Sequence, residues 1–169
     1  KTGMSKAEFN QEYLADFNTF EGQVWNFNYE TCVANLEEMD TSNMEVFAGL
    51  DVGYRDPTAF CVIGYDWDEK KYYVLEEYMH AERTTEQHAR VLQQLIEKWD
   101  IDAIYIDSAA QQMRFDLAQE YDISTINATK SVLDGIAAVA TIVDNENLIV
   151  DQSCKDTLIS LDQYQWNPN

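Results

Sequence analysis

Positive charge is scarce in this chain of 169 residues: 11 Lys and Arg stand against 31 Asp and Glu, for a formal net charge of −20. Proteins bind phosphate backbones chiefly through clustered Lys and Arg, so the composition argues against a domain that grips nucleic acid unaided. Two possibilities remain. The domain meets a polyanion through bound divalent cations and with help from a basic partner domain, or it does not touch nucleic acid at all.

Other scarcities remove further classes of protein. Two histidines argue against a histidine-rich zinc site. The three cysteines, Cys32, Cys61 and Cys154, are widely spread without metal-ligand spacing, so we expect reduced thiols in the core. No apolar run reaches the length of a membrane span and no segment resembles a signal peptide, so we expect no membrane association. The apolar content of 46% and aromatic content of 12% instead predict an ordered domain with a sizeable core.

The hydrophobic pattern predicts a mixed sheet from residue 46 onward. Strands at 46–53, 58–66 and 71–79 are joined by short polar turns, which is typical of an antiparallel meander. The elements expected next are a helix after a capping box at 84–87, a strand at 102–107, a helix from Ser108 to about Tyr121, a strand at 123–127, a helix from Ser131, a short strand at 147–150 and a helix from Ser153. This order indicates an α/β, ribonuclease H-like fold with flanking helices, in which the 102–107 strand lies parallel beside the first.

Residues 1–45 read as a separate lead-in to the domain at 46–169. A capping box at 5–8 predicts a short helix carrying Phe9, Tyr13 and Phe17. Residues 18–45 are rich in aromatics but weakly periodic, so we expect an irregular linker that packs on the main body. Because both ends of the chain look cut, we expect a piece of a larger protein.

Two aspartates occupy positions where the pattern predicts buried strands. Asp51 lies inside the apolar run 46–53 and Asp107 ends the run 103–107. A buried carboxylate costs free energy unless it is paired, hydrogen-bonded or bound to a cation. On parallel neighbouring strands the two would meet at one sheet edge, which predicts a site for Mg²⁺ or Mn²⁺ with both as ligands. The alternative, that each merely ends a strand or caps a turn, stays open.

Three cations are expected at the same sheet edge as the aspartates. Arg55 follows the first strand, Arg114 follows the 102–107 strand, and Lys130 follows the 123–127 strand. Ligand sites of open α/β sheets prefer this edge, so the three could contact a phosphate backbone. Ordinary surface salt bridges are an equal alternative.

An ordered set of segments resembles the nuclease domain of the large terminase subunit of tailed bacteriophages, which packages viral DNA. The segments GLDVG at 49–53 and DPTA at 56–59 resemble the first nuclease motif of that family, and IYIDSA at 104–109 resembles the second. The other matching segments are 9–15, which resembles the exit from the ATPase domain, and Lys130, 135–136 and 161–166, which resemble later helices.

The resemblance implies an endonuclease that cuts concatemeric double-stranded DNA with little sequence preference, using two divalent cations held by Asp51 and Asp107. It also implies an ATPase domain upstream in the same polypeptide, partners in the small terminase subunit and the portal protein, and a place in the host cell cytoplasm. The family's third acidic residue is expected beyond Asn169. Substitutes such as Asp144, Glu146 or Asp162 have no support from the resemblance.

Three other functions fit part of the pattern. A non-catalytic acidic docking module of a packaging motor is consistent with the net charge. Unlike a nuclease, such a module would not depend on manganese. An actin-like phosphotransferase also begins with a strand ending in Asp-x-Gly, yet it needs Gly-rich turns, and the six glycines here are not clustered. A Holliday-junction resolvase shares the expected fold and chemistry, but it fits residues 1–45 less well.

Overall fold

The structure is a computed structural model that describes residues 25–128 and 132–163, arranged in two compact units. One unit is Glu37–Thr129, and the other combines Lys1–Leu36 with Lys130–Asn169. The helix expected near residues 5–17 and the expected helix start at Ser131 lie outside the described residues. Each unit is described by itself below.

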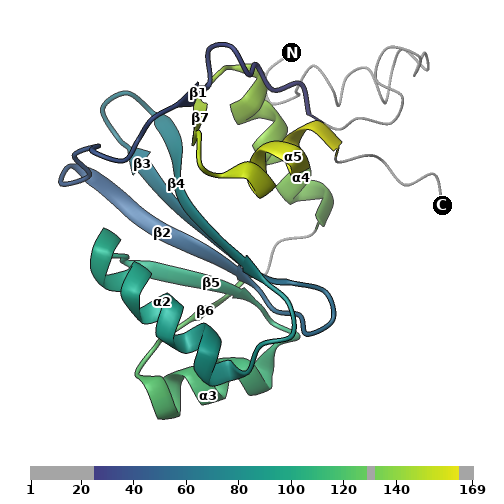
Figure 1. Cartoon of the computed structure of the whole chain (residues 1–169). Helices are drawn as coiled ribbons and strands as arrows, with labels where there is room; N and C mark the ends of the chain where they lie inside the picture. The colour runs from purple at the N-terminus through teal and green to yellow at the C-terminus, as the bar shows by residue number, and fades with distance from the viewer. Residues whose placement is uncertain (1–24, 129–131, 164–169) are drawn as a thin grey trace. The chain divides into compact units, whose positions relative to one another are not determined.

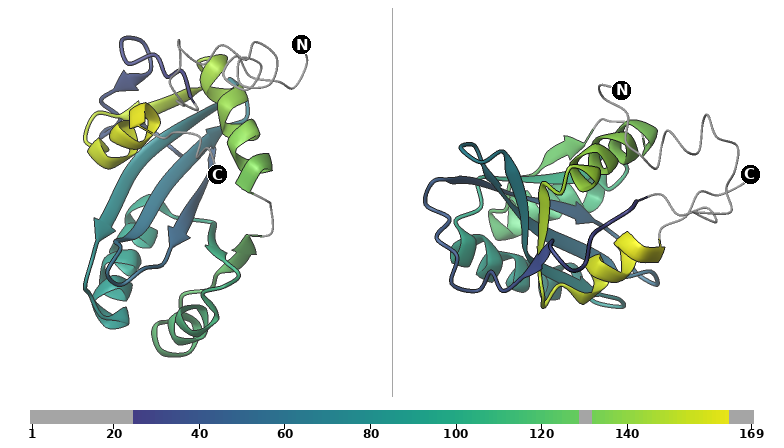
Figure 2. Two further views of the ribbon diagram at one scale, coloured as in Figure 1. Left: turned by 90° about the vertical axis from the view of Figure 1, so that its right-hand side faces the viewer. Right: turned by 90° about the horizontal axis from the view of Figure 1, so that it is seen from above.

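The Glu37–Thr129 unit is built on a mixed sheet with strands in the order β4-β3-β2-β5-β6. Its strands are β2 (Met44–Asp51), β3 (Thr58–Asp66), β4 (Lys71–His80), β5 (Ala103–Asp107) and β6 (Ile126–Ala128). Strands β2, β3 and β4 form an antiparallel meander, while β5 is parallel to β2 and β6 is parallel to β5. The expected meander and the expected parallel neighbour of the first strand are therefore confirmed (Figures 1 and 2).

Alternation along the strands decides which face of this sheet is buried. In β2, Val46, Ala48 and Leu50 are buried, whereas the residues between them are exposed or half-buried. Strand side chains point alternately to the two faces, so one face carries the apolar set. Helices α2 (Thr85–Trp99) and α3 (Gln111–Tyr121) lie next to each other on one side of the sheet (Figure 1).

Helix α2 begins as its sequence predicts. The Thr84 hydroxyl oxygen accepts a hydrogen bond from the Gln87 amide (3.2 Å), and the Gln87 side-chain oxygen accepts one from the Thr84 amide (2.9 Å). This reciprocal pair satisfies two amides that the helix itself leaves without a partner. The helix ends at Asp100, which adopts a left-handed conformation with φ of 51°.

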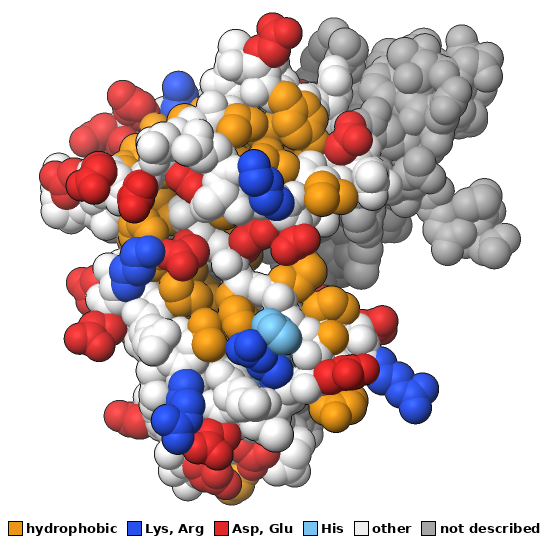
Figure 3. All heavy atoms as spheres, viewed as in Figure 1, with side chains coloured by type: hydrophobic (Ala, Val, Ile, Leu, Met, Phe, Trp, Pro, Cys, Tyr) orange, Lys and Arg blue, Asp and Glu red, His pale blue; other side chains and the backbone are white. Residues whose placement is uncertain are grey.

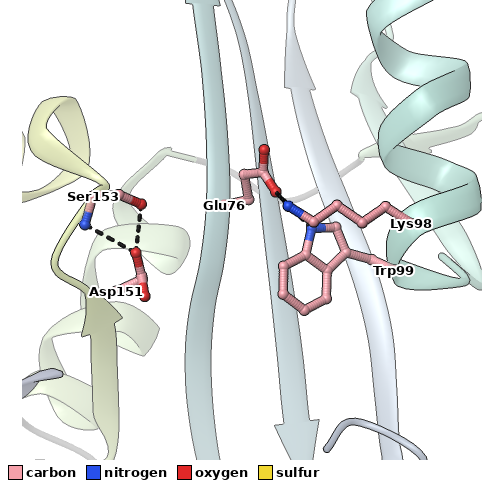
Figure 4. A network of polar contacts seen from close by, with 5 residues as sticks. All are labelled: Glu76, Lys98, Trp99, Asp151 and Ser153. Atoms are coloured by element: carbon pink, nitrogen blue, oxygen red, sulfur yellow. Dashed lines mark hydrogen bonds and ion pairs between the residues drawn. The ribbon is translucent and has the colours of Figure 1, made fainter. Parts of the chain in front are cut away.

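Polar contacts join β4 to α2 at two places. One carboxylate oxygen of Glu76 accepts hydrogen bonds from Lys98 Nζ (2.6 Å) and Trp99 Nε1 (2.9 Å), as Figure 4 shows. The Tyr78 hydroxyl lies 2.8 Å from Nδ1 of His88, which is buried. These contacts fix the helix on the strand and give buried polar atoms a partner.

The second unit contains a strand that the sequence did not reveal. Its elements are β1 (Val33–Ala34), α4 (Val132–Asp144), β7 (Leu148–Asp151) and α5 (Lys155–Gln163). Strands β1 and β7 are parallel, with Val150 N donating to Cys32 O and Gln152 N donating to Ala34 O, each at 2.8 Å. The expectation of an irregular linker over 18–45 is therefore wrong at residues 33–34, because a two-residue strand has no periodicity to detect.

Asp151, at the end of β7, is a buried carboxylate that holds backbone groups together. Its Oδ1 accepts a hydrogen bond from the Leu36 amide at 2.7 Å. Its Oδ2 accepts hydrogen bonds from the amide of Ser153 at 2.9 Å and from the Ser153 hydroxyl (Figure 4). Only 6% of Asp151 is exposed, so the charge is stabilised by these donors rather than by water.

The remaining expectations differ in detail. The first strand ends at Asp51 rather than at residue 53, and the expected 123–127 strand is shifted to Ile126–Ala128. Cys32 and Cys154 are buried and Cys61 is half-buried, and none of the three forms a disulfide. Within the residues that the structure describes, no helix has both the length and the apolarity that a membrane span requires.

Candidate functional site

The sheet register brings Asp51 and Asp107 next to each other. In the parallel pair β2–β5, Leu50 is the partner of Ile106, and the next residue on each strand is the aspartate. Neighbouring strands lie about 4.8 Å apart, so the two carboxylates share one end of the sheet. Leu50 and Ile106 are both buried, and the alternation of side chains therefore places both aspartates on the opposite face.

The two carboxylates are exposed, which corrects the expectation of burial. The runs around them are buried on one face only, because each strand alternates between buried and exposed side chains. Burial cost is therefore no argument for a cation here. What remains is the proximity of two carboxylates at one sheet edge and the absence of any hydrogen bond to the Asp51 side chain from the described residues.

Asp107 has a local structural role as well. Its Oδ1 accepts a hydrogen bond from the Ala109 amide at 3.0 Å, and its carbonyl oxygen accepts one from the Ala110 amide at 3.0 Å. The helix that was expected from Ser108 begins instead at Gln111, after Ala110, which makes no side-chain capping bond. Asp107 thus forms the turn itself, since a short carboxylate reaches the amide two residues on.

The loop after Asp51 is fixed by its neighbours. The Thr58 hydroxyl donates to the Gly53 carbonyl (2.7 Å) and accepts from the Gly53 amide (3.1 Å), while the Glu82 amide donates to the Tyr54 carbonyl (2.8 Å). A Cβ on Gly53 would lie 2.5 Å from the Asp56 carbonyl oxygen, so this position has no room for a side chain. Together these contacts fix the backbone that follows the Asp51 carboxylate.

Thr58 and Gly53 lie in the two segments that resemble the first nuclease motif, but neither was predicted to have a role of its own. Thr58 is fully buried at the start of β3, where the neighbouring inward positions are apolar. Its signal was a small hydroxyl residue directly after Pro57, at the first inward position of a predicted strand. A buried hydroxyl needs a hydrogen-bond partner, and here the partner is the backbone of the loop.

The three expected cations have different surroundings. Arg55 is exposed on the loop after β2 and forms no ion pair with any described residue. Arg114 is half-buried and donates to the Thr125 carbonyl oxygen at 3.2 Å, so part of its hydrogen-bonding capacity is used within the fold. Lys130 lies outside the described residues. The face drawn in Figure 3 shows Asp and Glu scattered widely, with fewer Lys and Arg among them.

The adjacent carboxylates fit one side of a hard-cation site. Mg²⁺ and Mn²⁺ prefer carboxylate oxygens, and Asp51 and the second oxygen of Asp107 face the same side of the sheet. No group of three or more His, Cys, Asp or Glu residues within 25–128 and 132–163 is arranged to hold a metal ion. The pair therefore supplies part of a ligand set.

The three possible substitutes for a third ligand all belong to the other unit. Glu146 already accepts hydrogen bonds from Asn28 Nδ2 (2.6 Å) and Thr31 Oγ1 (3.0 Å). It lines a hollow of about 650 Å³ together with Asp144 and residues 26–30. Asp162 lies on α5 and raises the pKa of Tyr29, an effect second to burial of that phenol.

Comparison with known proteins places the chain in a family. Residues 48–165 match the family described as "Terminase RNaseH-like domain". The chain is 46% identical over 170 residues to the large terminase subunit of Escherichia phage T5, covering 97% of this chain and 39% of that protein. It therefore spans about two-fifths of that relative's length.

Solved structures show the same fold. The large terminase of a thermophilic bacteriophage matches with a TM-score of 0.74 and 23% identity, over 86% of this chain and 38% of that one. The P22 large terminase nuclease domain matches with a TM-score of 0.70 and 16% identity, over 86% and 80%. The large terminase nuclease domain of bacteriophage SPP1, solved with bound Mn, matches with a TM-score of 0.64 and 18% identity, over 82% and 81%. The chain belongs to the RNase H-like nuclease-domain family of bacteriophage large terminases.

Proposed function

We propose that this chain is the endonuclease part of a DNA-packaging terminase and cuts concatemeric double-stranded DNA with little sequence preference. The observation that carries the proposal is the register of β2 and β5. Because of this register, Asp51 and Asp107 lie beside each other on one face of the sheet, at the carboxyl ends of the two strands. The fold of the terminase nuclease domains supports the same reading.

Each residue has a separate part in the proposed reaction. Asp51, on a strand that pairs with both β3 and β5, and Asp107, held by its turn, would be ligands of the two divalent cations. The cations, Mg²⁺ or Mn²⁺, activate a water and stabilise the leaving oxygen when bound. Arg55 places positive charge beside the carboxylates, where a DNA phosphate lies. A further acidic ligand is expected beyond Asn169.

The wider setting of the activity is part of the same proposal. We infer an ATPase domain upstream in the same polypeptide, because the phage T5 relative is a large terminase subunit of which this chain covers 39%. The small terminase subunit and the portal protein are the proposed partners, and the host cell cytoplasm is the proposed location. The lead-in 1–45 and nuclease domain 46–169 are proposed as the functional division of the chain.

The proposal is tested by plasmid nicking and linearisation in Mn²⁺, Mg²⁺ or chelator, for this chain and for a form extended past residue 169. We expect cutting in Mn²⁺ that the chelator abolishes. Asp51→Asn and Asp107→Asn should each reduce the rate by at least about 100-fold, because neutral amides are poor ligands for hard cations. Calorimetric titration with Mn²⁺ should show weaker binding by both variants.

A matched control removes one charge elsewhere on the same sheet. Asp68 is exposed in the turn between β3 and β4, at the other end of the sheet, and Asp68→Asn should cut at the unaltered rate. Equal losses in all three variants would show that net charge, rather than the carboxylate pair, controls the activity. No cutting by either form, together with no Mn²⁺ binding, would favour the non-catalytic docking module, which the net charge of −20 suits.

A further inference from the structure

An exposed aromatic side chain lies on the loop that follows Asp51. Tyr54 is 65% exposed, the highest value among the exposed large hydrophobic side chains of the described residues. It follows Asp51 by three positions and directly precedes Arg55, which is also exposed. No hydrogen bond or ring contact within 25–128 and 132–163 involves the Tyr54 side chain, so the fold itself gives no reason for its position.

The backbone that carries Tyr54 is held at three points. The Thr58 hydroxyl forms two hydrogen bonds to Gly53, and the Glu82 amide binds the Tyr54 carbonyl. Gly53 has no space for a Cβ beside the Asp56 carbonyl, and Pro57 restricts its own backbone. An exposed ring on a fixed loop loses little conformational freedom when a ligand packs on it, which favours binding.

The chemistry of the loop identifies the ligand. An aromatic ring beside a guanidinium is the combination that holds nucleotides, because the ring packs on the base or sugar while the cation meets the phosphate. We propose that residues 53–57 are a preformed nucleotide-contacting loop. In it, Tyr54 packs on a nucleotide next to the DNA phosphodiester bond that is cut at the Asp51–Asp107 pair. Thr58 is the positioning residue of this loop, acting through Gly53. The inference rests on the proposed nuclease function.

The opposite end of the same sheet offers a matched comparison. Trp67, in the turn between β3 and β4, is 63% exposed, but its ring packs edge-on against Tyr65 with centroids 4.8 Å apart. Its neighbours are the carboxylates of Asp66 and Asp68 rather than a guanidinium. Trp67 therefore has the exposure of Tyr54 without an adjacent guanidinium or the carboxylate pair, and it serves as the control.

Binding is measured apart from cutting, by fluorescence anisotropy of a labelled DNA duplex in Ca²⁺ at low salt. We expect Tyr54→Ala to weaken binding about 10-fold, since the variant loses the ring that packs on the nucleotide. Tyr54→Phe, which keeps the ring, should bind as the unaltered chain does, and so should Trp67→Ala. In a duplex carrying 5-iodouracil, photo-crosslinking should map to Tyr54 and not to Trp67.

The positioning role of Thr58 has its own pair of variants. Thr58→Ser keeps the hydroxyl and should retain binding and crosslinking, while Thr58→Val removes it and should reduce the Tyr54 crosslink several-fold. Circular dichroism and thermal melting identify any variant that fails to fold. If Thr58→Val is one of these, binding and crosslinking are compared between Thr58→Ser and the unaltered chain.

Unchanged binding by Tyr54→Ala, an equal loss with Trp67→Ala, or no DNA binding by the unaltered chain would each overturn the inference. Failure of the nuclease proposal is seen separately. In that case DNA binds and crosslinks at Tyr54 while no form of the chain cuts DNA in Mn²⁺.

Discussion

Aspartates end strands in both units of this protein, yet their surroundings are opposite. Asp51 and Asp107, at the ends of β2 and β5, are exposed, and Asp51 receives no hydrogen bond from the described residues. Asp151, at the end of β7, is 6% exposed and accepts hydrogen bonds from Leu36 and Ser153. The first arrangement leaves carboxylate oxygens available to a ligand, whereas the second uses them to hold the fold.

The comparison teaches that burial marks the structural aspartate here. A buried carboxylate persists because donors surround it, and removing it leaves those donors without partners. An exposed carboxylate is solvated and costs the fold little, so its presence beside a second carboxylate calls for a functional explanation. The same contrast extends to the polar residues between β4 and α2, which are paired in the manner of Asp151.

The largest expected effect on stability is that of Asp151→Ala. Loss of the carboxylate leaves the buried Leu36 amide unpaired and removes the acceptor of the part-buried Ser153 amide, so we expect the free energy of unfolding to fall by about 3 kcal/mol. Asp151→Asn keeps an acceptor oxygen and should lose less. Chemical denaturation followed by circular dichroism measures both. An Asp151→Ala variant as stable as the unaltered chain would break the distinction between the two kinds of aspartate.

A smaller effect is expected at Glu76. Glu76→Ala leaves the indole N–H of Trp99, a residue 8% exposed, without an acceptor and should cost about 1–2 kcal/mol. Lys98→Ala removes an ion pair whose lysine side chain is 56% exposed, together with the contact of Lys98 Nζ with the Trp99 ring, 5.1 Å from its centroid, so we expect a loss of about 1 kcal/mol. Thermal unfolding of the two variants provides the measurement. Equal losses would show that the ion pair, rather than the buried indole, sets the stability.

A third expectation concerns pH and His88. Burial lowers the pKa of His88, and the charges of Arg83 and His80 lower it further. Because the unfolded pKa is about 6.5, the neutral ring stabilises the fold above pH 6.5, and this stabilisation is lost as the pH falls from 6.5 toward the lower folded pKa. Denaturation midpoints between pH 7.5 and 5.5 should fall in the unaltered chain and fall less steeply in His88→Gln.

The exposed histidine supplies the control for that measurement. His80 lies at the end of β4 with its ring exposed, and its Nδ1 lies 3.1 Å from the Ala81 carbonyl oxygen. His80→Gln should keep most of the pH dependence of the unaltered chain, because burial is the largest cause of the lowered pKa of His88 and the charge of His80 contributes less. A flat profile in His80→Gln and a steep one in His88→Gln would reverse the assignment.

The smallest expected effect is that of Asp51→Asn on stability. Because the Asp51 side chain is exposed, the free energy of unfolding of Asp51→Asn should stay within about 0.5 kcal/mol of that of the unaltered chain. Asp107→Asn keeps an oxygen for the Ala109 amide and should behave similarly. Equilibrium denaturation in chelator measures both variants. A loss comparable to that of Asp151→Ala would mean that these carboxylates, too, hold the fold.

Much of the fold followed from sequence patterns that act locally. The strands at 58–66 and 71–79 and the capping box at Thr84 are confirmed, because alternation, turns and caps are local signals. The parallel neighbour of the first strand, which was predicted from the expected fold, is confirmed as well. The two-residue strand β1 was missed because its structure depends on a partner distant in the sequence.

The candidate site was located by a partly wrong argument. The apolar runs around Asp51 and Asp107 suggested burial on both faces, whereas each strand is buried on one face only. The register that makes the pair adjacent was predicted from the expected fold and is confirmed. The clasp between Thr58 and Gly53 could not be predicted, because it depends on the path of a loop rather than on a periodic pattern.

The pairing of β1 with β7 also determines the order in which the two units can fold. Residues 33–34 are made before Glu37–Thr129, whereas their partners at 150–151 are made only after it. Until then, the Leu36 amide has no Asp151 to bind. Closing so long a loop carries an entropic cost, so the unit that contains both strands is the last described part to assemble on the ribosome.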